Sequence, residues 1–230
     1  MRFIDLGVVT PEYSVCADKV LLASYPGEDT IMLYSRDRPC ISVGRFQNID
    51  DTVNTEYAKN NGISIVRRVS GGSNIYSDEK QMTYSLIMSK KRLPPARNDS
   101  FAVICSAVVN ALRTLGIDGV HKPVNDILVN GKKISGGAQA RSGDAVLQHG
   151  SIILDVDDGV VRSSLTDNKK RSYDGLTSVK EVLGYIPSRE DISKAMISGF
   201  SEVFGPIARG SLTKNEIGDI ERSLGLLLLV

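Results

Sequence analysis

Two adjacent lysines near the middle of the chain are the strongest candidates for chemistry. They lie in the segment NDILVNGKKISGGAQA, residues 125–140. Asn130-Gly131 predicts a two-residue hairpin turn, so Lys132 and Lys133 should lie on the returning strand and face opposite sides. One ammonium group can then enter a site, where it suits a carboxylate, an acyl phosphate or charge that develops in a transition state. The alternative interpretation is an ordinary hairpin with two exposed lysines.

A loop of small residues that follows two arginines is the second candidate. It is RRVSGGSNIYSD, residues 67–78, and Gly71-Gly72 lies at its centre. Such a loop lets a ligand approach the backbone closely and leaves N–H groups free to bind anionic oxygens. Arg67 and Arg68 could add charge-assisted contacts to phosphate or carboxylate. The two common phosphate-loop patterns are absent, so a β-turn beside a solvated charge pair is an equal alternative on composition alone.

The other candidate groups favour neither a metal site nor covalent catalysis. His149 lies in QHGS on an expected strand, where a lone histidine is more often structural. It and His121 are the only histidines, and Cys16, Cys40 and Cys105 form no pair, so no metal-ligand set is present. No cysteine lies in or beside the two motifs, and no G-x-S-x-G segment occurs. An odd number of scattered cysteines is typical of reduced thiols in a cytosolic protein.

Short strands and amphipathic helices must position these motifs. The apolar periodicity predicts helices at 12–24, 100–115 and 188–204. Capping boxes at Ser178 and Thr213 predict two more helix starts. Strands are expected at 31–35, 40–44, 63–68, 82–89, 126–129, 132–135 and 146–154. Hairpins in place of regular β-α-β crossovers favour an α+β fold with a mostly antiparallel sheet flanked by helices.

The 230 residues suffice for one large domain, and we expect a single domain over 1–230. Its motifs should lie within about 36–155, and its C-terminal part, about 177–223, should be helical. The net charge of +1 argues against a general nucleic-acid binder. No signal-peptide stretch is visible, and the longest apolar run, 224–230, is far shorter than the roughly 20 residues that span a bilayer. We therefore expect a cytoplasmic protein without nucleic-acid or membrane partners.

Together the motifs resemble those of the biotin/lipoate A/B protein ligase family. The family pattern is roughly R-R-x-S/T-G-G-G-x-V-Y-H-D, then N-D, a short hairpin and G-x-K-I-S-G-x-A, then H-G-[ST]. RRVSGGSNIYSD, NDILVNGKKISGGAQAR and QHGSIILD occur here in the same order. The segment RPCISVGRFQN, residues 38–48, is also similar to the family's first binding strand and loop. The resemblance extends over about residues 12–204, and three ordered motifs are more specific together than each is alone.

The resemblance implies a catalytic domain that condenses lipoate with ATP to lipoyl-adenylate and then acylates a carrier lysine. The implied carriers are the lipoyl domains of 2-oxoacid dehydrogenase acyltransferases and the glycine-cleavage H protein. Lys133, and not Lys132, matches the family's active-site lysine, which contacts the acyl carbonyl and the phosphate. Mg²⁺ is the implied metal, with Asp126 as its candidate ligand. The other implied ligand-binding residues are Arg68, Ser70, Gly71, Gly72, Asn74, Ile75, Asn125, Asp126, Gly136, Ala138 and His149.

The chain departs from the family pattern at two loop positions and in length. Ser73 stands for the third glycine and Ser77 for a histidine. The longer ligases carry an accessory C-terminal domain that is not expected here, and some family members supply it as a separate protein, which makes such a protein a candidate partner. The run Leu224–Val230 could be a docking edge for that partner or a strand packed on the core.

Three other functions compete with the ligase interpretation. The nearest is an octanoyltransferase, which moves octanoyl from acyl-carrier protein to the same lysine without ATP. Gln139-Ala140-Arg141 and Gln148-His149-Gly150 resemble one such subfamily, which however needs a nucleophilic cysteine where this chain has Pro123-Val124-Asn125. A biotin–protein ligase ranks lower, and a non-catalytic acyl-binding or carrier-docking module remains open.

Overall fold

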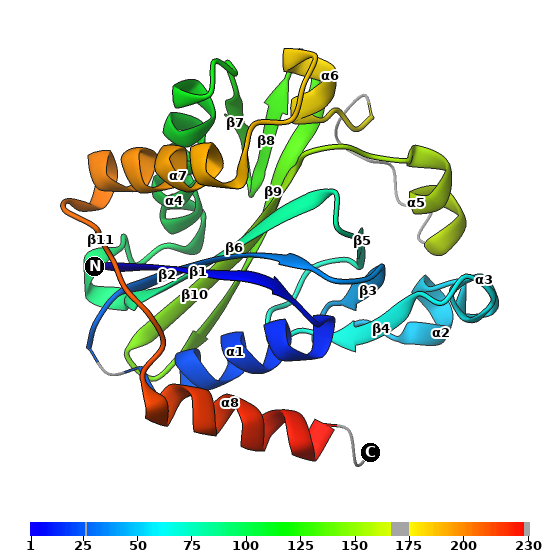
Figure 1. The fold of residues 1–230 in the computed structure, drawn as a ribbon, viewed down its shortest axis with the longest axis horizontal. Helices are drawn as coiled ribbons and strands as arrows, with labels where there is room; N and C mark the ends of the chain where they lie inside the picture. The colour runs from blue at the N-terminus through cyan, green and yellow to red at the C-terminus, as the bar shows by residue number, and fades with distance from the viewer. Residues whose placement is uncertain (26, 167–174, 228–230) are drawn as a thin grey trace.

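The fold is built on a mixed eight-stranded sheet (Figure 1). The computed structural model describes residues 1–25, 27–166 and 175–227. The strand order is β11-β1-β2-β6-β10-β9-β8-β7, in which β11, β1 and β2 are parallel and each further neighbouring pair is antiparallel. The expected α+β fold with a mostly antiparallel sheet is confirmed. The strands are β1 (Arg2–Val9), β2 (Thr30–Arg36), β6 (Gln81–Ser89), β7 (Val120–Lys122), β8 (Asp126–Val129), β9 (Lys132–Ser142), β10 (Ala145–Ile153) and β11 (Ala208–Arg209).

A second, three-stranded sheet carries the loops that were expected to bind a ligand. In it β3 (Cys40–Val43) pairs in parallel with β4 (Ser64–Arg67) and antiparallel with β5 (Ile75–Ser77). The short helices α2 (Ile49–Thr52) and α3 (Thr55–Asn60) lie beside it, at the right of Figure 1. The glycine-rich loop therefore connects the two outer strands of one small sheet, β4 and β5, which fixes both of its ends.

Helices cover both faces of the large sheet and enclose two apolar cores. On one face α4 (Arg97–Thr114) packs against α7 (Arg189–Phe204), and on the other α1 (Pro11–Ala23) packs against α8 (Lys214–Leu227) (Figure 1). The α4–α7 contact requires Gly199, because a Cβ there would lie 2.3 Å from the backbone nitrogen of Ala111. The remaining helices are η1 (Lys90–Arg92), α5 (Asp158–Ser164) and α6 (Val179–Leu183). No helix in the described ranges is both long and apolar enough to cross a membrane.

Both expected helix starts form, the one at Thr213 with both hydrogen bonds of a capping box and the one at Ser178 with the serine bond. Ser178 accepts a hydrogen bond from the backbone nitrogen of Glu181 and begins α6. At the start of α8, Thr213 Oγ1 accepts from the nitrogen of Glu216, whose carboxylate accepts from the nitrogen of Thr213. These bonds satisfy N–H groups that have no partner within the helix.

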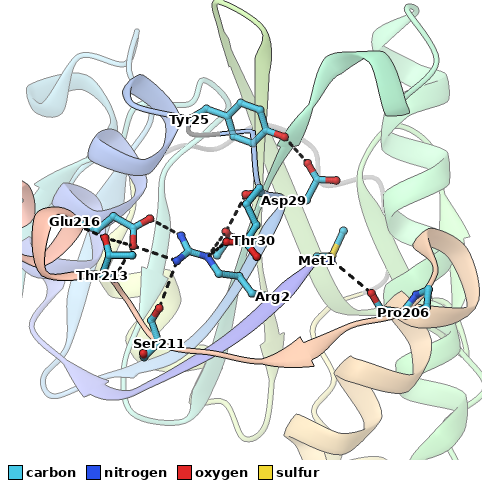
Figure 2. A network of polar contacts seen from close by, with 10 residues as sticks. Met1, Arg2, Tyr25, Asp29, Thr30, Pro206, Ser211, Thr213 and Glu216 are labelled. Carbon is cyan, nitrogen blue, oxygen red and sulfur yellow. Dashed lines mark hydrogen bonds and ion pairs between the residues drawn. The ribbon is translucent and has the colours of Figure 1, made fainter.

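The C-terminal segment is a helix, which corrects one sequence-based alternative. A strand was one of two interpretations of Leu224–Val230, but α8 continues to Leu227, and Leu228 to Val230 lie outside the described residues. The helical spacing of Ile220 and Leu224 places both against α1, and this packing decides the conformation. Figure 2 shows how Arg2 of β1 holds the start of α8, through an ion pair with Glu216 and a bond to the carbonyl of Ser211.

Candidate active site

A cleft of about 720 Å³ lies between the small sheet, β8 to β10 and the first turns of α4. This volume is in the range of ordinary small-molecule sites. Among the described residues of its wall Asp126 is the only carboxylate. The basic residues of the wall are Arg36, Arg45, Arg68, Arg97, Lys133 and Arg141. The imbalance favours an anionic ligand.

Arg68 holds the glycine-rich loop in place through hydrogen bonds to its backbone carbonyls. Its Nη1 donates to the carbonyl of Ser42 at 2.7 Å, and its Nη2 donates to the carbonyls of Gly71 and Ser73, each at 2.7 Å. Burial lowers the pKa of Arg68 to about 10, with a further contribution from the charge of Arg36, so the guanidinium remains charged at neutral pH. Arg68 thus uses its donors on protein carbonyls and acts on a ligand through the loop it shapes.

The loop presents backbone N–H groups that have no partner in the part of the chain that the structure describes. The amides of Gly71, Gly72 and Ser73 donate to no acceptor among the described residues. Because Arg68 draws two of the loop carbonyls inward, the surface that the loop offers is dominated by donors. Consecutive free amides of this kind bind anionic oxygens. The loop is therefore suited to phosphate or carboxylate.

The backbone at the end of β3, at Gly44, packs tightly against the backbone of this loop. A Cβ on Gly44 would lie 2.0 Å from the carbonyl oxygen of Gly72, so only glycine fits there. Asn74 fixes the approach, because its Oδ1 accepts from the nitrogen of Gly44 at 3.1 Å and its Nδ2 donates to Thr52 at 2.6 Å. Ile75 follows on the cleft wall with 40% of its surface exposed.

Lys133 enters the cleft from β9 and pairs with Asp126 of β8. The distance from Lys133 Nζ to Asp126 Oδ1 is 2.7 Å. Gly136 leaves room for the lysine, since a Cβ there would lie 2.5 Å from both Cε and Nζ. Asn125 donates through Nδ2 to the carbonyl of Gly137 and thereby ties β8 to β9. This arrangement holds an ammonium group where a carboxylate or phosphate oxygen in the cleft could contact it.

A chain of three hydrogen bonds connects Arg68 to Asp18 behind the wall of the cleft. Arg68 Nε donates to Ser70 Oγ at 3.0 Å, Ser70 Oγ lies 2.6 Å from His149 Nε2, and His149 Nδ1 lies 2.6 Å from Asp18 Oδ2. Asp18, Ser70 and His149 are all buried, and His149 also contributes to the wall of the cleft. The chain connects α1, β10 and the glycine-rich loop.

The three thiols lie in the protein interior. Cys16, Cys40 and Cys105 are 3%, 0% and 1% exposed, and none contributes to the described wall of the cleft. Burial raises the pKa of Cys105 to about 12. A protonated, enclosed thiol is a poor nucleophile. Within the described residues, no group of three or more His, Cys, Asp or Glu is arranged to hold a metal ion.

The sequence matches a known family over most of its length, and this decides the family. The family model described as the lipoyl protein ligase A/B catalytic domain matches residues 10–201. The chain belongs to this family. The match includes the glycine-rich loop, Lys133 and His149.

Relatives with two different names are similar to this chain. Octanoyltransferase LipM of Kyrpidia tusciae is 30% identical over 94% of this chain and 91% of its own length. Lipoate-protein ligase LplJ of Bacillus subtilis is 28% identical over 96% of this chain and 65% of its own length.

Solved structures of lipoate ligases share the fold. Lipoate-protein ligase A bound with ATP superposes with a TM-score of 0.85 at 25% identity, covering 97% of this chain and 94% of that chain. A chain from the structural analysis of a bipartite lipoate protein ligase and its E2 lipoyl domain from Thermoplasma acidophilum gives a TM-score of 0.85 at 24% identity, covering 97% of this chain and 91% of that chain.

Within this family fold the structure gathers the predicted site residues around one cleft, with one exception. The predicted residues that contribute to its wall are Arg68, Gly71, Gly72, Asn74, Ile75, Asn125, Asp126, Lys133, Gly136, Ala138 and His149. Ser70 is fully buried and lies behind the wall. Their roles in binding and catalysis stay predictions.

The sequence interpretation missed three residues that shape the site. Arg97 lines the cleft from α4, and Arg36 is 5% exposed at the end of β2, also on the cleft wall. Asp18 supports His149 from α1. A charged residue at a strand end was a weak signal for Arg36, whereas a single aspartate within a helix gave no signal at all.

Proposed function

We propose that this protein is a lipoate–protein ligase that activates its acid with ATP. In the first step a carboxylate oxygen attacks the α-phosphorus of ATP, and pyrophosphate leaves. In the second step the neutral amine of a carrier lysine attacks the carbonyl carbon of the acyl-adenylate. An amide forms, AMP leaves and the amine proton passes to solvent. Lipoyl domains of 2-oxoacid dehydrogenase complexes and the glycine-cleavage H protein are the proposed carriers.

The burial of all three thiols is the observation that carries this proposal. Transfer without ATP by way of an acyl-enzyme needs a nucleophile beside the lysine, and the wall around Lys133 offers no thiol among the described residues. An adenylate route needs instead a cation at the mixed anhydride and donors on its oxygens. Lys133 and the free amides of Gly71, Gly72 and Ser73 supply both.

The cleft also fits a nucleotide that carries a metal ion. Mg²⁺ is commonly held by one or two carboxylates together with the phosphates of its substrate. Asp126, the single carboxylate of the described wall, fits that role. When bound, the ion would neutralise charge on the phosphate oxygens.

Octanoyl transfer from acyl-carrier protein is the second candidate. It is favoured by the LipM name of close relatives and by Gln139-Ala140-Arg141 and Gln148-His149-Gly150. Cys105 is the candidate thiol for this route. Burial raises its pKa to about 12, and Gln148 and Asp126 of the neighbouring strands also affect that pKa.

Acylation of an apo lipoyl domain by the purified protein separates the candidates. Three donors are compared, namely lipoate with MgATP, synthetic lipoyl-adenylate and octanoyl-carrier protein, and the product is measured by mass. The ligase proposal expects acylation with the first two donors and ATP-dependent release of pyrophosphate. Acylation by octanoyl-carrier protein alone, without ATP, would establish the transferase instead. Binding of lipoate without transfer from any donor would indicate a non-catalytic module.

A further inference from the structure

The direction of each hydrogen bond between Arg68 and Asp18 follows from the groups at its two ends. A guanidinium can only donate, so Arg68 Nε gives its proton to Ser70 Oγ. A carboxylate can only accept, so His149 Nδ1–H gives its proton to Asp18. If Ser70 donates its hydroxyl proton to an unprotonated His149 Nε2, every bond of the chain has one donor and one acceptor. This pattern corresponds to an imidazole with its proton on Nδ1.

A proton on Nε2 would change this sequence of bonds. Ser70 Oγ would then accept from both Arg68 and Nε2–H, and the hydroxyl proton of Ser70 would need another acceptor. The structure shows none among the described residues. The arrangement thus distinguishes one form of His149 from the others.

Asp18 contributes more to the position of His149 than to the stability of the fold. Its side chain is 3% exposed, and its Oδ1 has no hydrogen-bond partner among the described residues. Leaving a buried carboxylate oxygen unpaired destabilises the fold. Arg36 lies on the cleft wall, and Ser14, one helical turn before Asp18, accepts from Arg36 Nε at 3.4 Å. One face of α1 therefore supports the floor of the cleft.

We propose that Asp18 is a positioning residue for acyl transfer, which acts by holding His149 as the Nδ1–H tautomer and, through Ser70, by fixing the glycine-rich loop. This inference rests on the proposed acyl-transfer function of the cleft. Which ring nitrogen of a histidine carries the proton is set by the partner of the other nitrogen. Without Asp18 the ring can take the other tautomer. Ser70 then loses its acceptor, and the amides of Gly71 and Gly72 lose their support.

The tautomer can be measured without any activity. The chain has two histidines, and in a His121→Ala background, labelled with ¹⁵N-histidine, long-range ¹H–¹⁵N spectra report His149 alone. His121 lies away from the chain of bonds, with its Nε2 near the carbonyl of Val124. The proposal expects a protonated Nδ1 and an unprotonated Nε2, and a loss of this pattern in Asp18→Asn. An Nε2–H tautomer in the protein with Asp18, or identical spectra for the two forms, would overturn it.

Transfer from preformed lipoyl-adenylate gives the functional test. Asp18→Asn keeps the size of the side chain, and it should lower the single-turnover rate by about 10- to 100-fold, the effect of small misplacements in a site. Asp29→Asn is the matched control. Asp29 is also a buried aspartate, but it accepts from Tyr25 (Figure 2) and from Arg92, and it does not belong to the described wall of the cleft. It should lose stability and keep its transfer rate.

A double-mutant cycle separates positioning from a general loss of stability. If Asp18 acts through Ser70, Asp18→Asn should cause little further loss of rate in a Ser70→Ala background. Independent, multiplicative losses would contradict the proposal. If the wild-type protein acylates no carrier with any donor, the proposed function fails, whereas the spectra still decide whether the chain of bonds exists.

Discussion

Lys132 and Lys133 are consecutive in the chain, yet their ammonium groups lie on opposite faces of β9. In the ladder Lys132 pairs with Val129, a core residue, and Lys133 pairs with Leu128. Directly opposed residues share a face of the sheet, so the two lysines are separated by the sheet itself. Lys132 Nζ reaches Glu181 of α6 at 2.8 Å, whereas Lys133 lines the cleft.

Lys133→Ala should lower acyl transfer by about a hundredfold or more, because it removes a cation at the reacting group. Lys132→Ala is the matched control and should keep most of the activity, since its partner Glu181 is on the far face. Transfer from lipoyl-adenylate to an apo lipoyl domain, followed by mass spectrometry, measures both. Equal losses of activity in the two variants would show that the cleft-facing side of β9 does not carry the functional lysine alone.

Replacement of all three cysteines by serine should leave ligase activity in place. The thiols are buried, and the raised pKa of Cys105, about 12, keeps it protonated at neutral pH. For the same reason iodoacetamide should not inactivate the native protein. Circular dichroism must confirm folding, because Cys105 packs in the main core. Loss of activity in a folded Cys105→Ser variant would favour the octanoyltransferase.

Gly44→Ala should weaken binding of lipoyl-adenylate by on the order of tenfold or more, since small displacements at a site have effects of this size. The added methyl group would collide with the carbonyl of Gly72 and push the loop away. Gly225→Ala is the control, because Gly225 lies in α8 with nothing within 4 Å of its Cβ position. It should be neutral or stabilise by up to about 1 kcal/mol. Calorimetric titration checks the affinity, and equal affinities would refute the proposed role of the close approach.

Glu216→Gln should destabilise the protein by about 3 kcal/mol, the cost of breaking a buried ion pair. Burial raises the pKa of Glu216, but hydrogen bonds from Arg2 and Thr213 outweigh it and leave the pKa below its ordinary value. The resulting stability is present above the ordinary glutamate pKa and is lost as the pH falls through the lowered one. Urea unfolding between pH 7 and 3 should therefore show a steeper acid loss for the wild type than for the variant. Parallel curves would contradict this assignment.

Local signals made the central elements predictable from the sequence. Asn130-Gly131 specified the hairpin that carries Lys133, and the boxes at Ser178 and Thr213 specified two helix starts, since each signal lies within a few residues of its effect. The ordered motifs then predicted most of the residues that lie around the cleft.

Long-range pairing explains what the sequence did not predict. The strands β1 and β11 pair across more than 200 positions in parallel, and neither shows a strong pattern of its own. Asp18 and His149 are separated by 131 positions, and nothing local to either indicates the other. The interpretation of Arg68 as a ligand contact could not foresee that three backbone carbonyls and Ser70 would occupy its donors.

The inward turn of the loop carbonyls toward Arg68 has a consequence for how negative charge is sensed. The groups offered by Gly71, Gly72 and Ser73 are peptide dipoles, which have no proton to lose or gain as the pH changes. Arg68, which binds the loop carbonyls directly, has a pKa of about 10. The amides and Arg68 should therefore add no pH dependence of their own in the physiological range, and any pH dependence of binding must originate in the ligand, in the other groups that support the loop or elsewhere in the cleft.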